Sequence, residues 1–159
     1  MKKIQLLGLA AVLAFASCKK NDVNTETQNV EVSKTQQAQI SSWTAVQNWT
    51  TAEGSAQGSI AENNITTAVA GEGLVLVYAN TKSTPVLLPA RLGNTYFYYQ
   101  VENGAIQINA SKTDASFDKN QQFSYIILSK DQLQKLEEKG FSKLQLMAMD
   151  YSNVKQLNK

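Results

Sequence analysis

The chain has 159 residues, with 15 Lys and Arg against 13 Asp and Glu, one cysteine and no histidine. Without histidine it cannot form a Ser-His-Asp or Cys-His catalytic group, and it lacks the commonest transition-metal ligand. A single cysteine also excludes an intramolecular disulfide. We therefore expect a protein that is not an enzyme and that needs no cofactor.

Residues 1–17 have the organisation of a bacterial lipoprotein signal peptide. Lys2 and Lys3 precede an apolar run that is too short to span a bilayer, and small residues then lead to Cys18. The sequence Phe-Ala-Ser-Cys at 15–18 resembles a lipobox, which implies that the Cys18 sulfur is lipidated and anchors the chain in a membrane. The alternative is an ordinary secretory peptide whose cleavage site falls near a free cysteine.

Removal of this leader takes away Lys2 and Lys3 and no acidic residue, which leaves thirteen basic and thirteen acidic residues. A neutral mature chain has no electrostatic basis for binding nucleic acid, so we expect no nucleic-acid partner. Residues 18–40 contain no aromatic residue, glycine or proline and are rich in Asn, Gln, Thr and Lys. We expect them to form a flexible tether, although Val30 and Val32 alternate as a first strand would.

Residues 41–159 are expected to form one mainly β domain, an antiparallel β-sandwich with one short C-terminal helix. Two β-branched apolar runs, 73–79 and 122–128, suit buried central strands. Weaker strand candidates are 43–50, 85–90 with its two prolines at a sheet edge, and 144–149 as a closing strand. If 43–50 is one uninterrupted strand, Trp43 and Trp49 share a face, and core packing is the expected use of both rings.

The clearest strand pair is a hairpin over residues 94–110. Asn103-Gly104 tolerates the positive φ angles of a two-residue type I′ turn, and such a turn fixes the register with Glu102 opposite Ala105. One face of the hairpin is then apolar, with Phe97, Tyr99, Val101, Ile106 and Ile108. The other face carries the candidate ligand-binding residues Tyr96, Tyr98, Gln100, Gln107 and Asn109.

This second face combines flat rings with amide groups, which a sugar or a partner protein can use for binding. The alternative is that Tyr96 and Tyr98 pack beneath the helix or a neighbouring loop, since tyrosine is also a good strand former.

One helix is predicted from Lys130 to Lys139. Ser129 can cap its first amides while Gln132 reaches back, the leucines at 133 and 136 make an apolar stripe, and Gly140 ends it. Residues 150–157 are a candidate for one more helical turn.

The remaining chemical patterns are incomplete. The S-x-x-K spacing at 152–155 lacks the S-D-N and K-T-G partners of the serine acylases. Asp114, Ser116, Asp118 and Asn120 alternate as at the start of a calcium loop. However, Lys119 stands where an EF-hand needs glycine and Tyr125 where it needs glutamate, so we expect a polar loop and no metal.

Several strand patterns resemble those of a group of uncharacterised lipoproteins of Bacteroidota. They are Gly-x-Gly-Leu-Val-Leu-Val-Tyr at 71–78, Leu-Leu-Pro at 87–89 and Gln-Phe-Ser-Tyr-Ile-Ile-Leu at 122–128, with Asp-Tyr-Ser-Asn-Val-Lys at 150–155. The resemblance implies a lipid-anchored protein of the cell envelope, in the outer membrane, with its periplasmic or surface-facing leaflet left open. We expect a non-enzymatic module that binds a protein partner or a glycan. The alternatives are a structural or assembly-accessory protein and, third, a hydrolase.

Overall fold

The computed structural model describes residues 37–114 and 117–157. The predicted signal peptide, Cys18, the valines at 30 and 32 and most of the predicted tether lie outside these residues, as does Ser116 of the predicted calcium loop.

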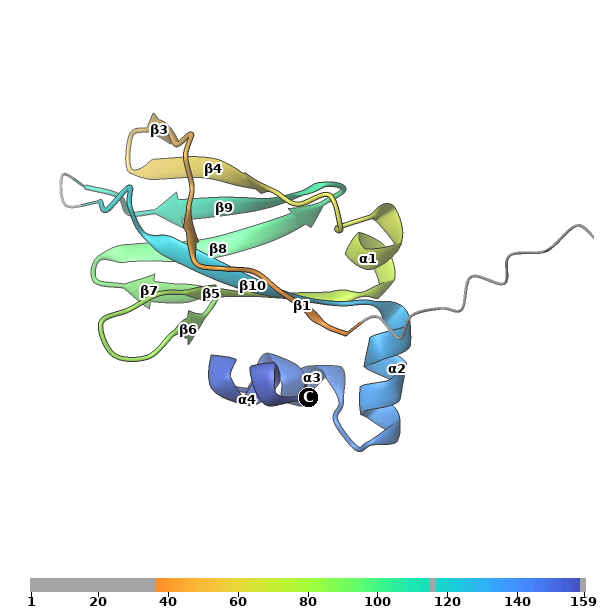
Figure 1. Cartoon of the computed structure of the whole chain (residues 1–159). Coiled ribbons are helices and arrows are strands. Elements are labelled where there is room, and N and C mark those ends of the chain that lie inside the picture. The colour runs from red at the N-terminus through yellow and green to blue at the C-terminus, as the bar shows by residue number, and fades with distance from the viewer. Residues whose placement is uncertain (1–36, 115–116, 158–159) are drawn as a thin grey trace, which may run out of the picture. The chain divides into compact units, whose positions relative to one another are not determined.

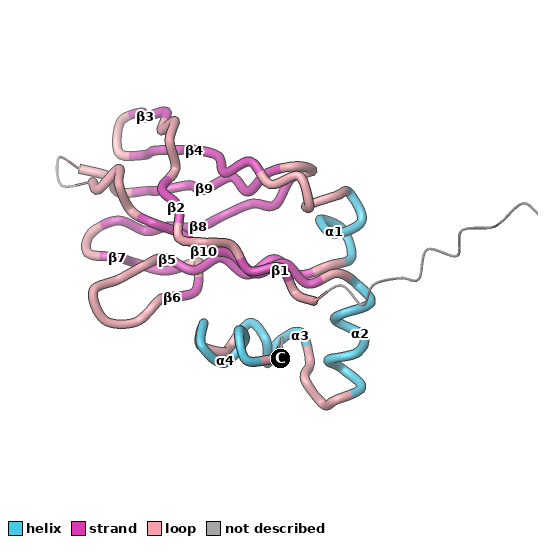
Figure 2. The backbone as a smooth tube through the Cα atoms, in the orientation of Figure 1, coloured by secondary structure: helices cyan, strands magenta, loops and turns pink. Residues whose placement is uncertain are grey.

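Two antiparallel sheets form the domain, which confirms the predicted mainly β sandwich (Figures 1 and 2). The first sheet has the order β1 (Gln39–Ile40), β10 (Gln122–Leu128), β5 (Leu74–Ala79), β6 (Val86–Leu87), and β2 (Thr44–Ala45) also pairs with β10. The second sheet has the order β3 (Thr50–Ala52), β4 (Ser55–Ala61), β9 (Ala105–Ser111), β8 (Thr95–Glu102), β7 (Ala90–Leu92).

The two predicted central strands, β5 and β10, pair with each other and are buried almost throughout. Their alternate side chains face two different cores. Val75, Val77, Phe123 and Ile127 pack with residues of the second sheet, such as Ile108. Leu76, Tyr78 and Ile126 pack with helical residues, such as Leu146. The first sheet is therefore covered on both faces, which explains why its central strands are continuous apolar runs.

Four short helices replace the single predicted one: α1 (Thr67–Glu72), α2 (Lys130–Glu138), α3 (Lys143–Met147) and α4 (Tyr151–Gln156). Helix α2 confirms the prediction, because Ser129 and Gln132 form the expected capping box and Gly140 follows with a positive φ of 90°. Helix α4 confirms the predicted last turn. Figure 1 shows α2, α3 and α4 on the side of the first sheet that faces away from the second.

The predicted closing strand at 144–149 is wrong, because this segment is helix α3 and its end. The Gln145 backbone N donates a hydrogen bond to Ser142 Oγ, and the Ser142 backbone N donates one to Gln145 Oε1. This second capping box starts a helix that buries Leu146 against the first sheet, whereas a strand would have needed a free sheet edge there.

The predicted strand at 43–50 is also wrong as a single element. β2 belongs to the first sheet and β3 to the second, so the chain crosses between sheets at 46–49. Trp43 therefore packs on Tyr151, with ring centroids 5.3 Å apart, and Trp49 packs on Phe117, 5.1 Å away. Both rings pack against a core, as predicted. They do not share a face, because Trp49 packs on the core between the sheets and Trp43 on the core beneath the helices.

The strand pairing refines two boundaries and confirms the hairpin. The segment 85–90 does lie at sheet edges, but it divides into β6 of the first sheet and the start of β7 of the second. Gln39 and Ile40, predicted as the end of the tether, pair with Ile127 and Ile126 and so belong to the domain. The hairpin has the predicted register, with Glu102 opposite Ala105, and Gly104 has a φ of 80°.

Candidate functional site

The outer side of the second sheet presents a polar surface that we call the open face. It consists of three cross-strand rows, Tyr96–Ser111–Ser55, Tyr98–Asn109–Gln57 and Gln100–Gln107–Ser59. Residues directly opposite one another on antiparallel strands point to the same side, so β8, β9 and β4 supply one continuous surface. The alternating positions on the same strands, among them Phe97 and Ile108, face the core.

All five predicted binding residues lie together on the open face. The four residues that the sequence analysis missed are Ser55, Gln57, Ser59 and Ser111. The first three belong to β4, whose burial alternates at every second residue. That period was present in the sequence, but the small side chains and Gly58 weakened it, because they gave no clear contrast between apolar and polar positions.

The two tyrosines are exposed, which contradicts the alternative that a helix or loop covers them. Tyr96 keeps 37% and Tyr98 keeps 39% of its accessible surface. Their ring centroids are 6.1 Å apart and their planes differ by 30°, so the two rings form one similarly oriented aromatic surface. Helices α2, α3 and α4 lie instead on the first sheet.

A hydrogen-bond donor in the middle row has no partner. The Nδ2 atom of Asn109 is buried, and it is the one buried side-chain nitrogen or oxygen atom within 37–114 and 117–157 that makes no hydrogen bond. Leaving such a donor unsatisfied costs roughly 1–3 kcal/mol. Such a donor is unusual, since buried polar groups in proteins are almost always paired.

The nine residues of the open face are tyrosine, serine, glutamine and asparagine, so its three rows carry no formal charge. Arg91, opposite Tyr96, and Glu102, opposite Ala105, point to the same side at its borders, and both are exposed. Recognition by the three rows would depend on shape, ring contact and hydrogen bonds, with one charge of each sign at the border.

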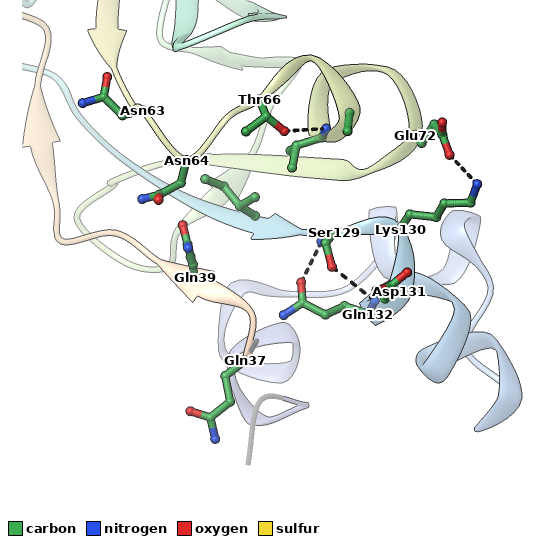
Figure 3. Close-up of a pocket in the computed structure, with 13 residues that line it drawn as sticks. Gln37, Gln39, Asn63, Asn64, Thr66, Glu72, Ser129, Lys130, Asp131 and Gln132 are labelled. Carbon is green, nitrogen blue, oxygen red and sulfur yellow. Dashed lines mark hydrogen bonds and ion pairs between the residues drawn. The ribbon is translucent and has the colours of Figure 1, made fainter. Parts of the chain in front are cut away.

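A second feature is a hollow of about 450 Å³ between α1, α2 and β1, shown in Figure 3. We call it the amide cleft, because five of its lining residues carry carboxamides: Gln37, Gln39, Asn63, Asn64 and Gln132. Val69 and Ile127 add apolar surface from the core. Sequence analysis did not find this cleft, because its walls come from three separate segments, at residues 37–39, 63–72 and 127–132.

Backbone and side-chain bonds hold the loop that carries Asn63 and Asn64. Glu62 N donates to Gly104 O at 2.8 Å, which joins the loop to the hairpin turn. Asn64 donates from its backbone N and its Nδ2 to Glu62 Oε1, at 3.0 and 2.7 Å, while Tyr125 Oη donates to Glu62 Oε2 at 2.5 Å. Burial acts to raise the pKa of Glu62, but these hydrogen bonds outweigh it and hold the pKa below its ordinary value.

The opposite wall contains the beginning of α2. Ser129 N donates to Gln132 Oε1 at 2.6 Å, so the capping box forms part of the lining (Figure 3). At the rim, Lys130 Nζ lies 2.5 Å from Glu72 Oε2, and this hydrogen-bonded pair lowers the pKa of Glu72 and raises that of Lys130. The two charges neutralise each other, although both side chains are largely exposed.

The other sequence candidates do not assemble into a site. Asp118 accepts a hydrogen bond from the Asn120 amide at 2.9 Å, which is a local turn, and no group of three or more metal-ligating acids or thiols occurs in the described residues. Lys155 lies over the ring of Tyr151, 5.9 Å from its centroid, and Ser152 is an exposed residue of α4.

None of the helices in the described part of the chain has the length and apolar character needed to cross a bilayer. No protein-family model matches the chain, and neither the curated proteins nor the solved structures contain a match to it.

Proposed function

We propose that this protein is a lipid-anchored, non-enzymatic binding protein of the bacterial cell envelope, and that its open face binds a neutral glycan chain. The observation that carries the proposal is a set of three uncharged rows in which two exposed tyrosine rings stand beside glutamine and asparagine side chains. Rings offer flat contact to the apolar side of a sugar, and carboxamides offer both donors and acceptors to its hydroxyl groups.

The composition of the open face favours a glycan over a protein partner. Protein interfaces concentrate their binding energy in a dry apolar centre, with aromatic and arginine anchors. Here the central row beside Tyr98 continues into Asn109 and Gln57, which are polar. A broad face formed by three strands also suits an extended chain of sugars, since it does not enclose a small molecule.

The carboxamides beside Tyr98 support the same ligand class. The Oε1 and Nε2 atoms of Gln57 and Gln107 flank Asn109 in the adjacent positions of β4 and β9 and can bind hydroxyl groups. The Nδ2 atom of Asn109 is closed to solvent, so it does not belong to this binding surface.

The proposed anchor rests on Cys18 and on the resemblance to lipoproteins of Bacteroidota, which implies a location in the outer membrane. Cys18→Ala should abolish metabolic palmitate labelling and release the chain from the membrane fraction without unfolding it. If wild type carries no palmitate and Cys18→Ala still partitions with membranes, the proposed anchor is wrong.

A glycan array followed by isothermal titration calorimetry tests the open face. The ligand would be titrated into the purified lipoprotein in a detergent without a sugar headgroup. Tyr96→Ala/Tyr98→Ala should weaken binding by at least tenfold, because each lost ring contact contributes on the order of 1 kcal/mol. Leu144→Ala/Met147→Ala is the matched control, since it removes two exposed apolar side chains from α3.

Unchanged affinity in the tyrosine double variant would exclude the open face as the glycan site. Crosslinking in intact cells, with one envelope protein captured through the open face and no glycan bound on the array, would instead support the alternative of a structural or assembly-accessory protein.

A further inference from the structure

The amide cleft is separate from the open face and opens between the two sheets. Gln39 stands opposite Ile127, whose side chain belongs to the core between the sheets, so Gln39 faces inward at the edge of the first sheet. Asn63 and Asn64 follow β4, at the margin of the second sheet. The cleft is therefore an opening of the sandwich interior, at a position where a core would normally place apolar side chains.

Several of its carboxamides are not used in bonds within the protein, and Gln37, Asn63 and Asn64 are exposed to solvent. Within the described residues, the side chains of Gln37, Gln39 and Asn63 make no hydrogen bond, and Asn64 uses only its Nδ2, toward Glu62. In Figure 3 the side chain of Gln39 extends from β1 toward Asn64 on the facing loop. Each carboxamide has two donors and one acceptor oxygen, so the two walls offer a set of paired donors and acceptors to a molecule between them.

The remaining lining limits what such a molecule can be. Val69 and Ile127 provide a small apolar surface inside the cleft. The charges of Glu72 and Lys130 neutralise each other at the rim, which leaves Asp131 as the unbalanced charge of the lining. A volume of about 450 Å³ lies in the ordinary range for sites that hold small molecules.

We infer that the amide cleft binds a small neutral molecule that carries both an amide and hydroxyl groups, for which an N-acetylated amino sugar is the fitting class. The amide of such a sugar pairs with the carboxamides of Gln39 and Asn64, and its methyl group contacts Val69 and Ile127. The ring hydroxyls bind the outer carboxamides of Gln37 and Asn63. This inference does not depend on the glycan proposed for the open face.

A purely structural role for these residues makes a different prediction. A polar side chain that points inward from an edge strand discourages pairing with another chain. If that is the whole role of Gln39, then Gln39→Leu changes stability or aggregation and leaves ligand binding unaffected. If the cleft is a site, Gln39→Leu keeps the fold, because leucine suits an inward-facing position, and it removes a hydrogen-bonding group from the wall.

The test uses the full lipoprotein in a detergent without a sugar headgroup, with N-acetylglucosamine as the probe. Saturation-transfer NMR and calorimetry should show saturable binding. Glucose lacks the amide and N-acetylglycinamide lacks the ring hydroxyls, so both should bind at least tenfold more weakly. Gln39→Leu/Asn64→Leu should weaken the binding of N-acetylglucosamine by about tenfold, which corresponds to two lost hydrogen bonds. Gln156→Leu, a matched change at an exposed position of α4 outside both the cleft and the open face, should leave it unchanged.

Three results would overturn the inference. The first is that wild type shows no saturable binding of N-acetylglucosamine, and the second is that Gln39→Leu/Asn64→Leu binds it as tightly as wild type does. The third is that wild type binds N-acetylglycinamide as tightly as N-acetylglucosamine, which would indicate a peptide-like ligand. Loss of N-acetylglucosamine binding in Tyr96→Ala/Tyr98→Ala but not in the cleft variant would place the sugar on the open face. Circular dichroism and thermal melting of each variant separate a loss of binding from a loss of fold.

Discussion

The hydroxyl of Tyr99 on β8 donates a 2.7 Å hydrogen bond to the backbone carbonyl of Val75 on β5, and so joins the two sheets through one side chain. Val75 lies beyond the end of β6, which pairs only with Tyr78 and Ala79, so no neighbouring strand satisfies its carbonyl. Tyr99 therefore closes this side of the sandwich with its ring against the core and its hydroxyl on an edge carbonyl.

Tyr99→Phe should lower the free energy of unfolding by roughly 1–3 kcal/mol, because the Val75 carbonyl loses its partner while the packing of the ring is kept. Urea denaturation measures the change. Tyr98→Phe, the neighbouring change on the open face, should stay within about 0.5 kcal/mol of wild type. An equal effect of both substitutions would contradict the role assigned to this bond.

The same substitution should alter the response to alkali. Burial raises the pKa of Tyr99, so its neutral form contributes stability that is complete below the ordinary tyrosine pKa of 10.0 and is lost as the pH rises above it. Tyr99→Phe should remove this part of the alkaline loss, as followed by urea midpoints between about pH 9 and 11. Burial also raises the pKa values of Tyr78 and Tyr125, so Tyr99→Phe should still lose stability in alkali, but less than wild type does.

Gly58 allows the segment that crosses between the sheets to lie close to β4. A Cβ atom at this position would overlap Val46 Cγ1 and come within 3.3 Å of Trp49 Cε3. Gly58→Ala should therefore destabilise the domain by roughly 1–3 kcal/mol through overpacking. Gly71→Ala is the matched control: its Cβ meets nothing within 4 Å, and alanine in a helix should stabilise by about 0.5–1 kcal/mol. Thermal melting should show shifts of opposite sign.

Helix α3 gives a test of its own placement with two leucines of different burial. Leu146 is fully buried against the first sheet, whereas Leu144 keeps 79% of its surface. Leu146→Ala should cost roughly 2–5 kcal/mol, and Leu144→Ala should have little effect. In a strand, alternate residues point to the same face, so Leu144 and Leu146 would be buried or exposed together. Similar effects of the two substitutions would therefore contradict the helix.

The loop beside the amide cleft should loosen in acid. Because the folded protein lowers the pKa of Glu62, its carboxylate contributes stability that is present above the ordinary pKa of 4.5 and is lost as the pH falls through the lower folded value. Glu62→Gln should remove this component, so urea midpoints should fall less steeply below about pH 4.5 than in wild type. Tyr125→Phe should act in the same direction, since it deletes the hydroxyl that stabilises the carboxylate. An unchanged acid slope in both variants would show that Glu62 does not contribute.

Elements specified by neighbouring residues were predictable from the sequence. The turn at Asn103-Gly104 determined the register of the hairpin over seven residue pairs, and with it the five predicted residues of the open face. The box of Ser129 and Gln132 likewise marked the start of α2. In both cases the interactions span only a few residues, so the information lies within a short window of the chain.

Only the tertiary structure decided where these elements meet. It made residues 144–149 a helix, because Leu146 could be buried against the first sheet, and it divided 43–50 between two sheets. It joined β4 to the hairpin, which extended the open face, and it brought β1 opposite the loop after β4, which formed the amide cleft. Such contacts connect segments far apart in the chain. Their free energy comes from apolar surface that one segment buries against another, and the sequence of either segment alone does not show which partner it meets. The sequence by itself determined the turns, the caps, the central strands and the lack of histidine, whereas the sites arise from packing between distant segments.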